Sequence, residues 1–388
     1  MVNSREHGTV VILSTADFSG GIWTNKQHLA TGLARDRQVL YVESLGLRRP
    51  RISVADLTRM RKRLKDASGH GRPEGTTESA RAVRVVSPRV LPFHANWLAR
   101  SLNQRILQAS IVPELAESEP ETLWSFSPVT YGMERLATHF VYHSVDLLHE
   151  QPGLPAGLLL DAERRVVQRA DAVIASSIKI AEHLAQLGRT DVILWENVAD
   201  TALFGRDLTG AREPRAIFAG NLTPQKVDFS LLAEVAASGT PLALAGPIGI
   251  DGTSDREVER LLRDPKVSYL GPLSLNHLAR EVARSRIGLI PYKLSGLTSG
   301  IFPMKTFEYL AAGLEVVSTP LASFAATDIS GLHIASAPKF ASMVHNRMQQ
   351  FSEPAAAERS QLAQTHSWEN RFEQARQLLS WSSHTTLD

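Results

Sequence analysis

Short apolar runs alternate with amphipathic stretches along the chain. Near-continuous apolar runs bounded by turn residues are typical of strands buried in a parallel sheet. We predict such strands at residues 9–14, 38–42, 83–86, 122–126, 140–145, 171–176, 192–195, 216–219, 242–245, 267–270, 287–292 and 315–319. Helices are expected among them at residues 23–34, 96–107, 161–170, 178–187, 229–237, 257–262, 275–283 and 367–379. This alternation predicts an α/β protein with helices on both faces of parallel sheets.

Residues 287–320 form the most informative unit of this pattern. An apolar strand is followed by a loop rich in Ser, Thr and Gly, and Pro303 suits the first turn of the next helix. The backbone N–H groups of Ser299, Gly300 and Ile301 are then expected at a helix N-terminus. Such a terminus binds anions, so this loop is a candidate phosphate site.

Glu308 lies in the helix that follows, three residues after Lys305. A carboxylate there can accept hydrogen bonds from a vicinal diol such as ribose. Diphosphate and ribose together would make a nucleotide site. The alternative is that Lys305 and Glu308 are an ordinary i, i+3 pair on a helix surface. Spacing alone leaves both interpretations open.

Composition narrows the class of protein. A chain of 388 residues can form two domains, and a net charge of +2 gives no global attraction to nucleic acid. The absence of cysteine excludes disulfides, thiol catalysis and cysteine-ligated zinc. The histidines other than His143 show no spacing typical of metal ligands in the sequence. No phosphate-loop or nucleophile-elbow motif occurs. Because no apolar run suits a membrane span or a signal peptide, we expect a cytoplasmic protein.

Residues 303–319 read P-M-K-T-F-E-Y-L-A-A-G-L-E-V-V-S-T. This segment resembles the donor-site segment of GT-B glycosyltransferases, and is most similar to the family 4-like (group 1) bacterial enzymes that include the teichuronic-acid type. R-A-D-A-V-I-A-S-S and E-N-V-A-D-T-A-L-F resemble the end of the N-terminal domain of these enzymes. The Ser-Trp start of residues 367–379 resembles their final helix. The resemblance covers nearly the whole chain, loosely before residue 140.

The resemblance implies a GT-B architecture of two Rossmann-like domains that face a central cleft. Residues 1–205 would form the acceptor domain and residues 206–365 the nucleotide-sugar donor domain. Residues 366–388 would form a C-terminal helix that crosses back onto the N-terminal domain.

The resemblance also implies roles in binding the donor. Glu308 would hold the ribose, and Lys305 would lie with the loop amides near the diphosphate. Further donor-site residues would be Gly21 in the first loop, Gly220 and Asn221 after a strand, Lys226 as a cation on the diphosphate, and Leu273, whose backbone would read the base. A plain tight turn is an equal alternative for Gly21.

The segment departs from the family pattern at two positions. Gly300 stands where many relatives have the first Glu of an E-x7-E pair, and Glu315 stands where Pro is usual. A third departure lies in the loop after residue 220, because Asn221 replaces a common Arg. The Gly300 departure leaves open which group contacts the transferred sugar.

Three residues are candidates for moving the acceptor's proton. Asp17 lies in the first loop, and His143 and Asp146 end the strand at residues 140–145. Many relatives have His directly before that Asp, where this chain has Val145. A turn or cap residue is the alternative for Asp17, and a packed ring is the alternative for His143.

The resemblance implies a glycosyltransferase that uses a nucleotide-diphosphate sugar, with a UDP-sugar favoured. The acceptor would be a cell-envelope glycan, a lipid-linked glycan or a small natural product, and transfer would occur with retention. No metal or other cofactor is expected. One alternative is a catalytically silent GT-B protein that binds a nucleotide sugar or partners an active transferase. The other is a GT-B-shaped sugar-nucleotide epimerase.

A basic segment runs from Arg48 to Lys65, with Asp56 as its one acidic residue and aliphatic side chains interspersed. It predicts an amphipathic surface that contacts an anionic acceptor or the inner face of an anionic membrane. The alternative is a solvated face. Residues 66–81, which follow it, have the composition of a loop.

Overall fold

The computed structural model describes residues 8–19, 23–47, 82–115, 121–208, 210–248, 256–325 and 327–384. The basic segment from Arg48 to Lys65, residues 66–81 and Gly21 lie outside these ranges. The chain divides into two compact units. The N-terminal unit comprises Met1–Glu196 and Phe372–Asp388, and the C-terminal unit comprises Asn197–Arg371.

The N-terminal unit contains a parallel sheet in the order β3-β2-β1-β4-β5-β6-β7. Its strands are β1 (Val10–Leu13), β2 (Val39–Val42), β3 (Arg84–Val86), β4 (Thr122–Ser125), β5 (His139–Ser144), β6 (Ala172–Ala175) and β7 (Ile193–Leu194). The order reverses between β1 and β4. Polar loops that follow these two strands therefore lie at a topological switch point, where ligands of such sheets bind.

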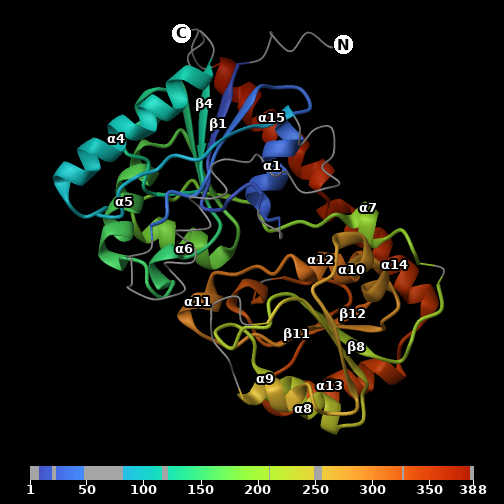
Figure 1. Ribbon diagram of the computed structural model, residues 1–388. Coiled ribbons are helices and arrows are strands. Elements are labelled where there is room, and N and C mark those ends of the chain that lie inside the picture. Colours follow the sequence, from blue (N-terminus) through green and yellow to red (C-terminus); the bar gives the residue numbers. More distant parts are fainter. Residues whose placement is uncertain are drawn as a thin grey trace. The chain divides into compact units, whose positions relative to one another are not determined.

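Helices flank this sheet (Figure 1). They are α1 (Asn25–Leu33), α4 (Trp97–Ile111), α5 (Ala156–Arg169) and α6 (Ile178–Gln186), joined by most of α15 (Trp368–His384). Phe372 of α15 packs directly on Gly32 of α1, where an added Cβ would lie 2.2 Å from the ring. Arg376 of α15 pairs with Asp36 at 2.5 Å. These contacts attach the C-terminal helix to the N-terminal unit.

The C-terminal unit has a second parallel sheet, in the order β10-β9-β8-β11-β12-β13. Its strands are β8 (Ala216–Ala219), β9 (Leu242–Ala245), β10 (Val267–Gly271), β11 (Ile287–Ile290), β12 (Glu315–Ser318) and β13 (Leu332–Ile334). Its helices are α7 (Thr201–Phe204), α8 (Phe229–Ala237), α9 (Arg256–Leu261), α10 (Leu275–Ala283), α11 (Gly296–Ser299), α12 (Lys305–Ala311), α13 (Ala337–Gln349) and α14 (Glu353–Ala363). This order reverses between β8 and β11, which gives the second switch point.

Close packing fixes α12 against this switch point. Tyr309 lies over Gly288 of β11, where an added Cβ would come within 2.2 Å of its ring. The Tyr309 hydroxyl accepts a hydrogen bond from the Ala219 N–H at 2.9 Å. Because Tyr309 is fully buried, this bond satisfies two groups that water cannot reach. The next helical turn back, which carries Lys305, is thereby held near the end of β8.

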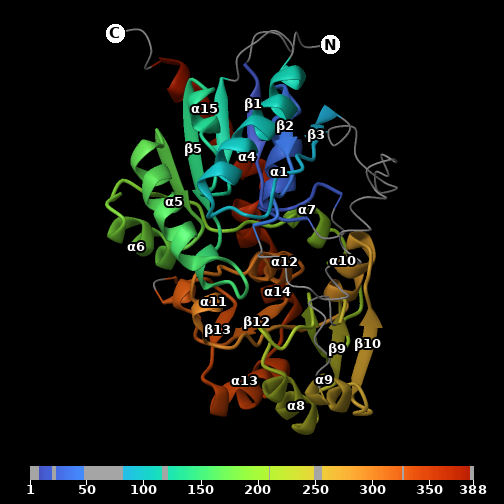
Figure 2. The same ribbon diagram turned by 60° about the vertical axis from the view of Figure 1, so that its left-hand side comes forward.

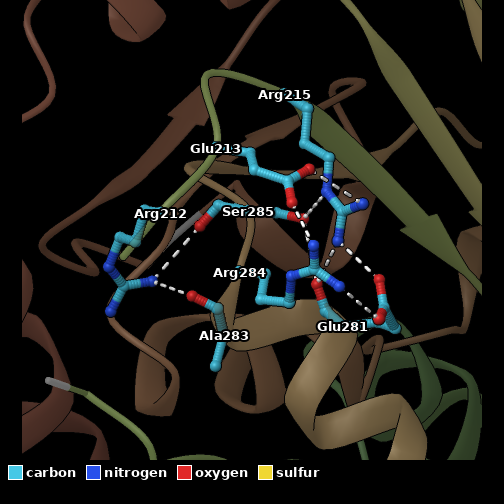
Figure 3. A network of polar contacts seen from close by, with 7 residues as sticks. All are labelled: Arg212, Glu213, Arg215, Glu281, Ala283, Arg284 and Ser285. Carbon is cyan, nitrogen blue, oxygen red and sulfur yellow. Dashed lines mark hydrogen bonds and ion pairs between the residues drawn. The ribbon is translucent and has the colours of Figure 1, made fainter. Parts of the chain in front are cut away.

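A polar network secures the opposite edge of the same sheet (Figure 3). Arg215, just before β8, pairs with Glu281 of α10 at 2.7 Å and donates to the Ser285 hydroxyl at 3.0 Å. Arg212 donates to the Ala283 carbonyl at 2.8 Å. These contacts join the start of β8 to the connection between α10 and β11. They lie at the amino ends of the strands, so we assign them to stability rather than to ligand binding.

The structure differs from the predicted elements in one loop, in the segment after β7, where α7 was not predicted, and in the region after residue 320. The expected loop at residues 293–302 contains the short helix α11, which has a capping box between Ser295 and Thr298. β13, α13 and α14 were not predicted. Among the described residues, no helix has the length and apolar character that crossing a bilayer requires.

Candidate functional site

Glycines form the carboxyl edge of the C-terminal sheet. Gly220 follows β8 and has a φ of 149°, and Gly246 follows β9 with a φ of 131°. An added Cβ at Gly246 would lie 2.0 Å from the Gly220 carbonyl oxygen. Gly246 also donates its N–H to the Gly271 carbonyl at 2.8 Å. Only glycine permits this backbone crowding, so the loops after β8 and β9 can pack closely together next to the β8–β11 switch point, where ligands of such sheets bind.

Lys305 lies directly against Gly220. An added Cβ at Gly220 would come within 2.8 Å of the Lys305 Nζ, which also lies 6.0 Å from the centre of the Phe218 ring. Burial lowers the pKa of Lys305, but Tyr292 and Glu308 outweigh burial, so the net direction is upward. Lys305 therefore carries its positive charge at the switch point. The absence of a side chain at Gly220 makes room for it.

Glu308 lies one helical turn beyond Lys305 on α12 and is half-buried. Burial raises the pKa of its carboxyl group, Lys305 opposes this rise, and Asp200 adds to it. The sequence motif predicted both residues. The structure places Lys305 against Gly220 and Glu308 one helical turn further along α12, within electrostatic reach of Lys305. The predicted cation and the predicted carboxylate of the donor site thus lie one turn apart on one helix.

The expected placement of the loop amides is wrong. Ser299 donates its N–H to the Ser295 carbonyl at 2.9 Å, and Ile301 donates to the Thr298 carbonyl at 3.1 Å. The Gly300 N–H also points to the Thr298 carbonyl, as the cap of α11. These amides belong to the C-terminal end of α11 rather than to the N-terminus of α12, because the capping box starts a separate helical turn. A role near the diphosphate stays a prediction that would require this turn to open.

The other predicted donor residues surround the same edge. Asn221 is exposed directly after Gly220, and Leu273 is half-buried shortly after Gly271. Half-buried Lys226 accepts a backbone hydrogen bond from the Lys293 N–H at 2.8 Å. This bond places two cationic residues next to each other in the loops after β8 and β11. Lys293 was not predicted, although it stands in the Ser-, Thr- and Gly-rich loop.

Asn197 is a second residue that sequence reasoning missed. Its side-chain Nδ2 donates to the Phe302 carbonyl at 2.6 Å, so it fastens the loop between α11 and α12. Asp200, in the same E-N-V-A-D phrase, caps α7 through a bond from the Leu203 N–H at 3.0 Å. The phrase was recognised as a family feature, but nothing in the sequence alone showed what it contacts.

The predicted proton-transfer residues of the N-terminal unit have different environments. Asp17 is exposed in the loop after β1, and its carbonyl accepts a bond from the Gln27 side chain at 3.0 Å. Asp146 follows β5 and lies 4.0 Å from the Lys26 Nζ. Lys26 is 6% exposed and was not predicted. Lys26 thus places a positive charge close to the Asp146 carboxylate.

His143 is enclosed by aromatic rings. It is 4% exposed, and its ring centre lies 4.8 Å from Phe126, 6.1 Å from Trp124 and 6.0 Å from Trp195. The structure thus favours the packed-ring alternative over contact with an acceptor. Asp17 and Asp146 are the more accessible candidates.

One group of described side chains has the composition of a metal site. His149, Glu163 and His183 offer ligand atoms within 4.8 Å of one another. They share no residue with the donor site. Their spacing in the sequence showed no sign of such a group, because the three residues come from different elements.

Comparison with known proteins finds a family model that matches most of the C-terminal unit. Residues 213–350 match the family model described as glycosyl transferases group 1. A curated relative is TuaH of Bacillus subtilis (strain 168), whose name assigns it as a glycosyltransferase of teichuronic acid biosynthesis. It is 31% identical over 214 residues, which cover 52% of this chain and 53% of TuaH. The chain thus spans about half the length of the curated relative it matches.

Solved structures share the architecture of the whole chain. HepE of Anabaena, solved in complex with UDP, is 15% identical and has a TM-score of 0.66 over 96% of this chain and 100% of its own. The sucrose-phosphate synthase of Thermosynechococcus elongatus is 16% identical and has a TM-score of 0.69 over 98% and 100%. At these identities the likeness establishes the fold alone. The chain therefore has the GT-B fold, and its residues 213–350 match the family model of the group 1 glycosyl transferases.

Proposed function

We propose that this protein is a glycosyltransferase that transfers a sugar from a nucleotide-diphosphate sugar to a glycan, lipid-linked or natural-product acceptor. The observation that carries the proposal is the position of Lys305 against Gly220, at the switch point of the C-terminal sheet, with Glu308 one helical turn beyond Lys305. The group 1 family match and the teichuronic acid relative support it.

Transfer of a sugar requires stabilisation of the departing diphosphate. Lys305 supplies a positive charge at the carboxyl edge of the sheet, and Lys226 and Lys293 lie in adjacent loops. Fixed cations of this kind stabilise developing negative charge without reorganisation during the reaction. We therefore propose that the chemistry proceeds without a metal at the donor site. Glu308 holds the ribose, and the Leu273 backbone faces the base.

A UDP-sugar is the favoured donor, and transfer proceeds with retention. Support for UDP comes from HepE, which was solved with UDP and also with UDP-glucose. Support for retention comes from the resemblance to family 4 and from Val145, which stands where a histidine could serve as the base. NMR spectroscopy of the product linkage tests it. An inverted product, together with an inactive Asp17→Asn variant, would assign the base to Asp17.

The basic segment from Arg48 to Lys65 contacts an anionic acceptor or the anionic inner face of a membrane, where the protein acts peripherally. Each cation near such a surface contributes about 1 kcal/mol at modest salt. Co-sedimentation with anionic and neutral vesicles, at low and high salt, measures the contact. The proposal fails if binding is absent at low salt, or if it survives replacement of Arg59, Arg61, Lys62 and Arg63 by Ser.

Release of UDP from a panel of UDP-sugars, with and without acceptor extracts, tests the proposed activity. We expect release that depends on the acceptor. Interconversion of the donor without an acceptor would instead indicate an epimerase. Tight nucleotide binding without either reaction, across the full panel, would indicate a silent partner protein. A thermal-shift screen with UDP, GDP, ADP and dTDP identifies the base, because a ligand of the native state raises Tm with its affinity.

A further inference from the structure

Three side chains of the N-terminal unit meet although they are distant in sequence. His149 lies in the 3-10 turn Leu148–Glu150 after β5, Glu163 lies in α5, and His183 lies in α6. Figure 2 shows α5 and α6 together on one side of the N-terminal sheet. The two imidazole ring centres are 4.6 Å apart, and the His183 Nε2 lies 2.8 Å from the Glu163 Oε2.

We propose that His149, Glu163 and His183 bind Zn²⁺ or a similar borderline divalent ion. Two imidazole nitrogens and one carboxylate oxygen are a ligand set typical of such ions. One ligand atom of each residue already lies within 4.8 Å of the other two. Ligand atoms of a tetrahedral ion at about 2.1 Å lie about 3.4 Å apart. Binding therefore requires only two small changes. The distance from the His183 Nε2 to the Glu163 Oε2 must lengthen slightly from 2.8 Å, and the longer distances between ligand atoms, up to 4.8 Å, must shorten.

The carboxylate is positioned as metal ligands usually are. Glu163 is 6% exposed, and its Oε1 accepts a hydrogen bond from the Tyr142 hydroxyl at 2.7 Å. The Ser144 hydroxyl lies 3.4 Å from the same oxygen. Both partners come from β5, so the strand fixes one oxygen and leaves Oε2 on the side of the histidines. Such outer contacts orient the ligands of metal sites.

An independent observation concerns His149. Its Nδ1 is buried and has no hydrogen-bond partner among the residues that the structure describes. Its Nε2 lies 3.7 Å from the Glu150 carboxylate. Buried polar atoms are nearly always satisfied, so an orphaned ring nitrogen beside a carboxylate and a second imidazole calls for a partner. A divalent ion supplies one, and the neighbouring carboxylate then stabilises the metal-bound ring.

The proposed ion would fasten a loop to two helices. His149 is three residues after Asp146, so the ion would link the loop that carries this candidate catalytic residue to α5 and α6. The histidine side chains are 15% and 14% exposed, which leaves room for water as a fourth ligand. The site lies wholly in the N-terminal unit, so it does not depend on nucleotide binding in the C-terminal unit.

Calorimetric titration of the chelator-treated full chain with Zn²⁺ tests the proposal. We expect saturable binding of one ion. His149→Gln and His183→Gln should each weaken it by at least about 100-fold, and Tyr142→Phe by about 10- to 100-fold. His277→Gln, at an exposed histidine of α10, is the control and should bind as the parent chain does.

The visible spectrum of the Co²⁺-loaded parent chain gives a second readout that needs no variant. Four- or five-coordinate bands from nitrogen and oxygen ligands would support the site. The proposal is overturned if the parent chain binds no stoichiometric Zn²⁺, or if both histidine variants bind it equally well. A six-coordinate Co²⁺ spectrum like that of the aqueous ion would also overturn it.

Discussion

Glu308 is the residue on which the proposed nucleotide recognition depends most. It lies on the turn of α12 after Lys305, and a carboxylate on a ribose diol makes charge-assisted hydrogen bonds. Replacement by Ala should cost about 1.5–3 kcal/mol of UDP binding, or roughly 10- to 150-fold in Kd, while the fold remains intact. Calorimetry measures the affinity, and circular dichroism checks the fold. Glu234→Ala, at an exposed position of α8, serves as the control. Unchanged affinity in the folded Glu308→Ala variant would refute the assignment.

The contacts of Glu315 explain why this chain departs from the family motif at that position. It occupies the usual Pro position, is 3% exposed, and opens β12. Arg347 donates to its Oε1 at 3.1 Å and Arg359 at 2.8 Å, and His333 contacts its Oε2. Burial raises the pKa of this carboxyl group, but hydrogen bonds from His333 and Arg347 and the charge of Arg359 lower it to about 2. The acidic residue is therefore part of a buried ion-pair network that replaces the proline.

This network predicts a pH-dependent stability. The folded pKa of about 2 lies below the ordinary value of 4.5, so the stabilisation is complete above pH 4.5 and is lost as the pH falls towards 2. Glu315→Gln should lower the free energy of unfolding at pH 7 by about 3 kcal/mol, because it leaves buried arginines uncompensated. Urea unfolding of both proteins from pH 7 to pH 2.5 should show this difference shrinking below pH 4.5. A difference that is constant with pH would contradict the lowered pKa.

At the scale of elements, the contact between the loop after β8, at Gly220, and the helix α12 determines where the Lys305 side chain lies. Gly220→Ala would force an unfavourable φ at a cost of about 1–3 kcal/mol and would place a methyl group 2.8 Å from the Lys305 Nζ. The flexible end of Lys305 would move, so UDP affinity should fall by about tenfold or more. Gly157→Ala in α5 has open space around it and is the control; it should leave affinity unchanged and stabilise by up to about 1 kcal/mol. Equal UDP affinity in the two variants would show that the position of Lys305 is unimportant.

The regular elements were largely predictable because most strands are continuous apolar runs. Buried runs such as Ala216–Ala219 and Leu242–Ala245 were predicted with their observed bounds. Strand β13 was missed because Leu332–Ile334 is a short edge strand with His333 at its centre. Helix α11 was missed because its four residues are defined by local capping rather than by an apolar face. That capping also explains the wrong placement of the loop amides.

At the scale of the whole molecule, the donor site was more predictable than the rest. Lys305 and Glu308 are close in sequence and belong to one motif, so a single helix brings them together. Lys26, Asn197 and the His149–Glu163–His183 group depend on contacts between distant segments, which sequence spacing does not encode. His143 was placed correctly on its strand, but its enclosure by aromatic rings from other strands was not foreseeable.

The GT-B fold provides a switch point in each sheet. The proposed function requires that the switch point between β8 and β11 binds the nucleotide. A crystal structure of the full chain grown with UDP tests this most directly. The account predicts ribose hydroxyls within about 2.6–3.2 Å of the Glu308 carboxylate, and a diphosphate beside the Lys305 Nζ. UDP bound elsewhere on the chain, or bound here with its ribose turned away from Glu308, would contradict it.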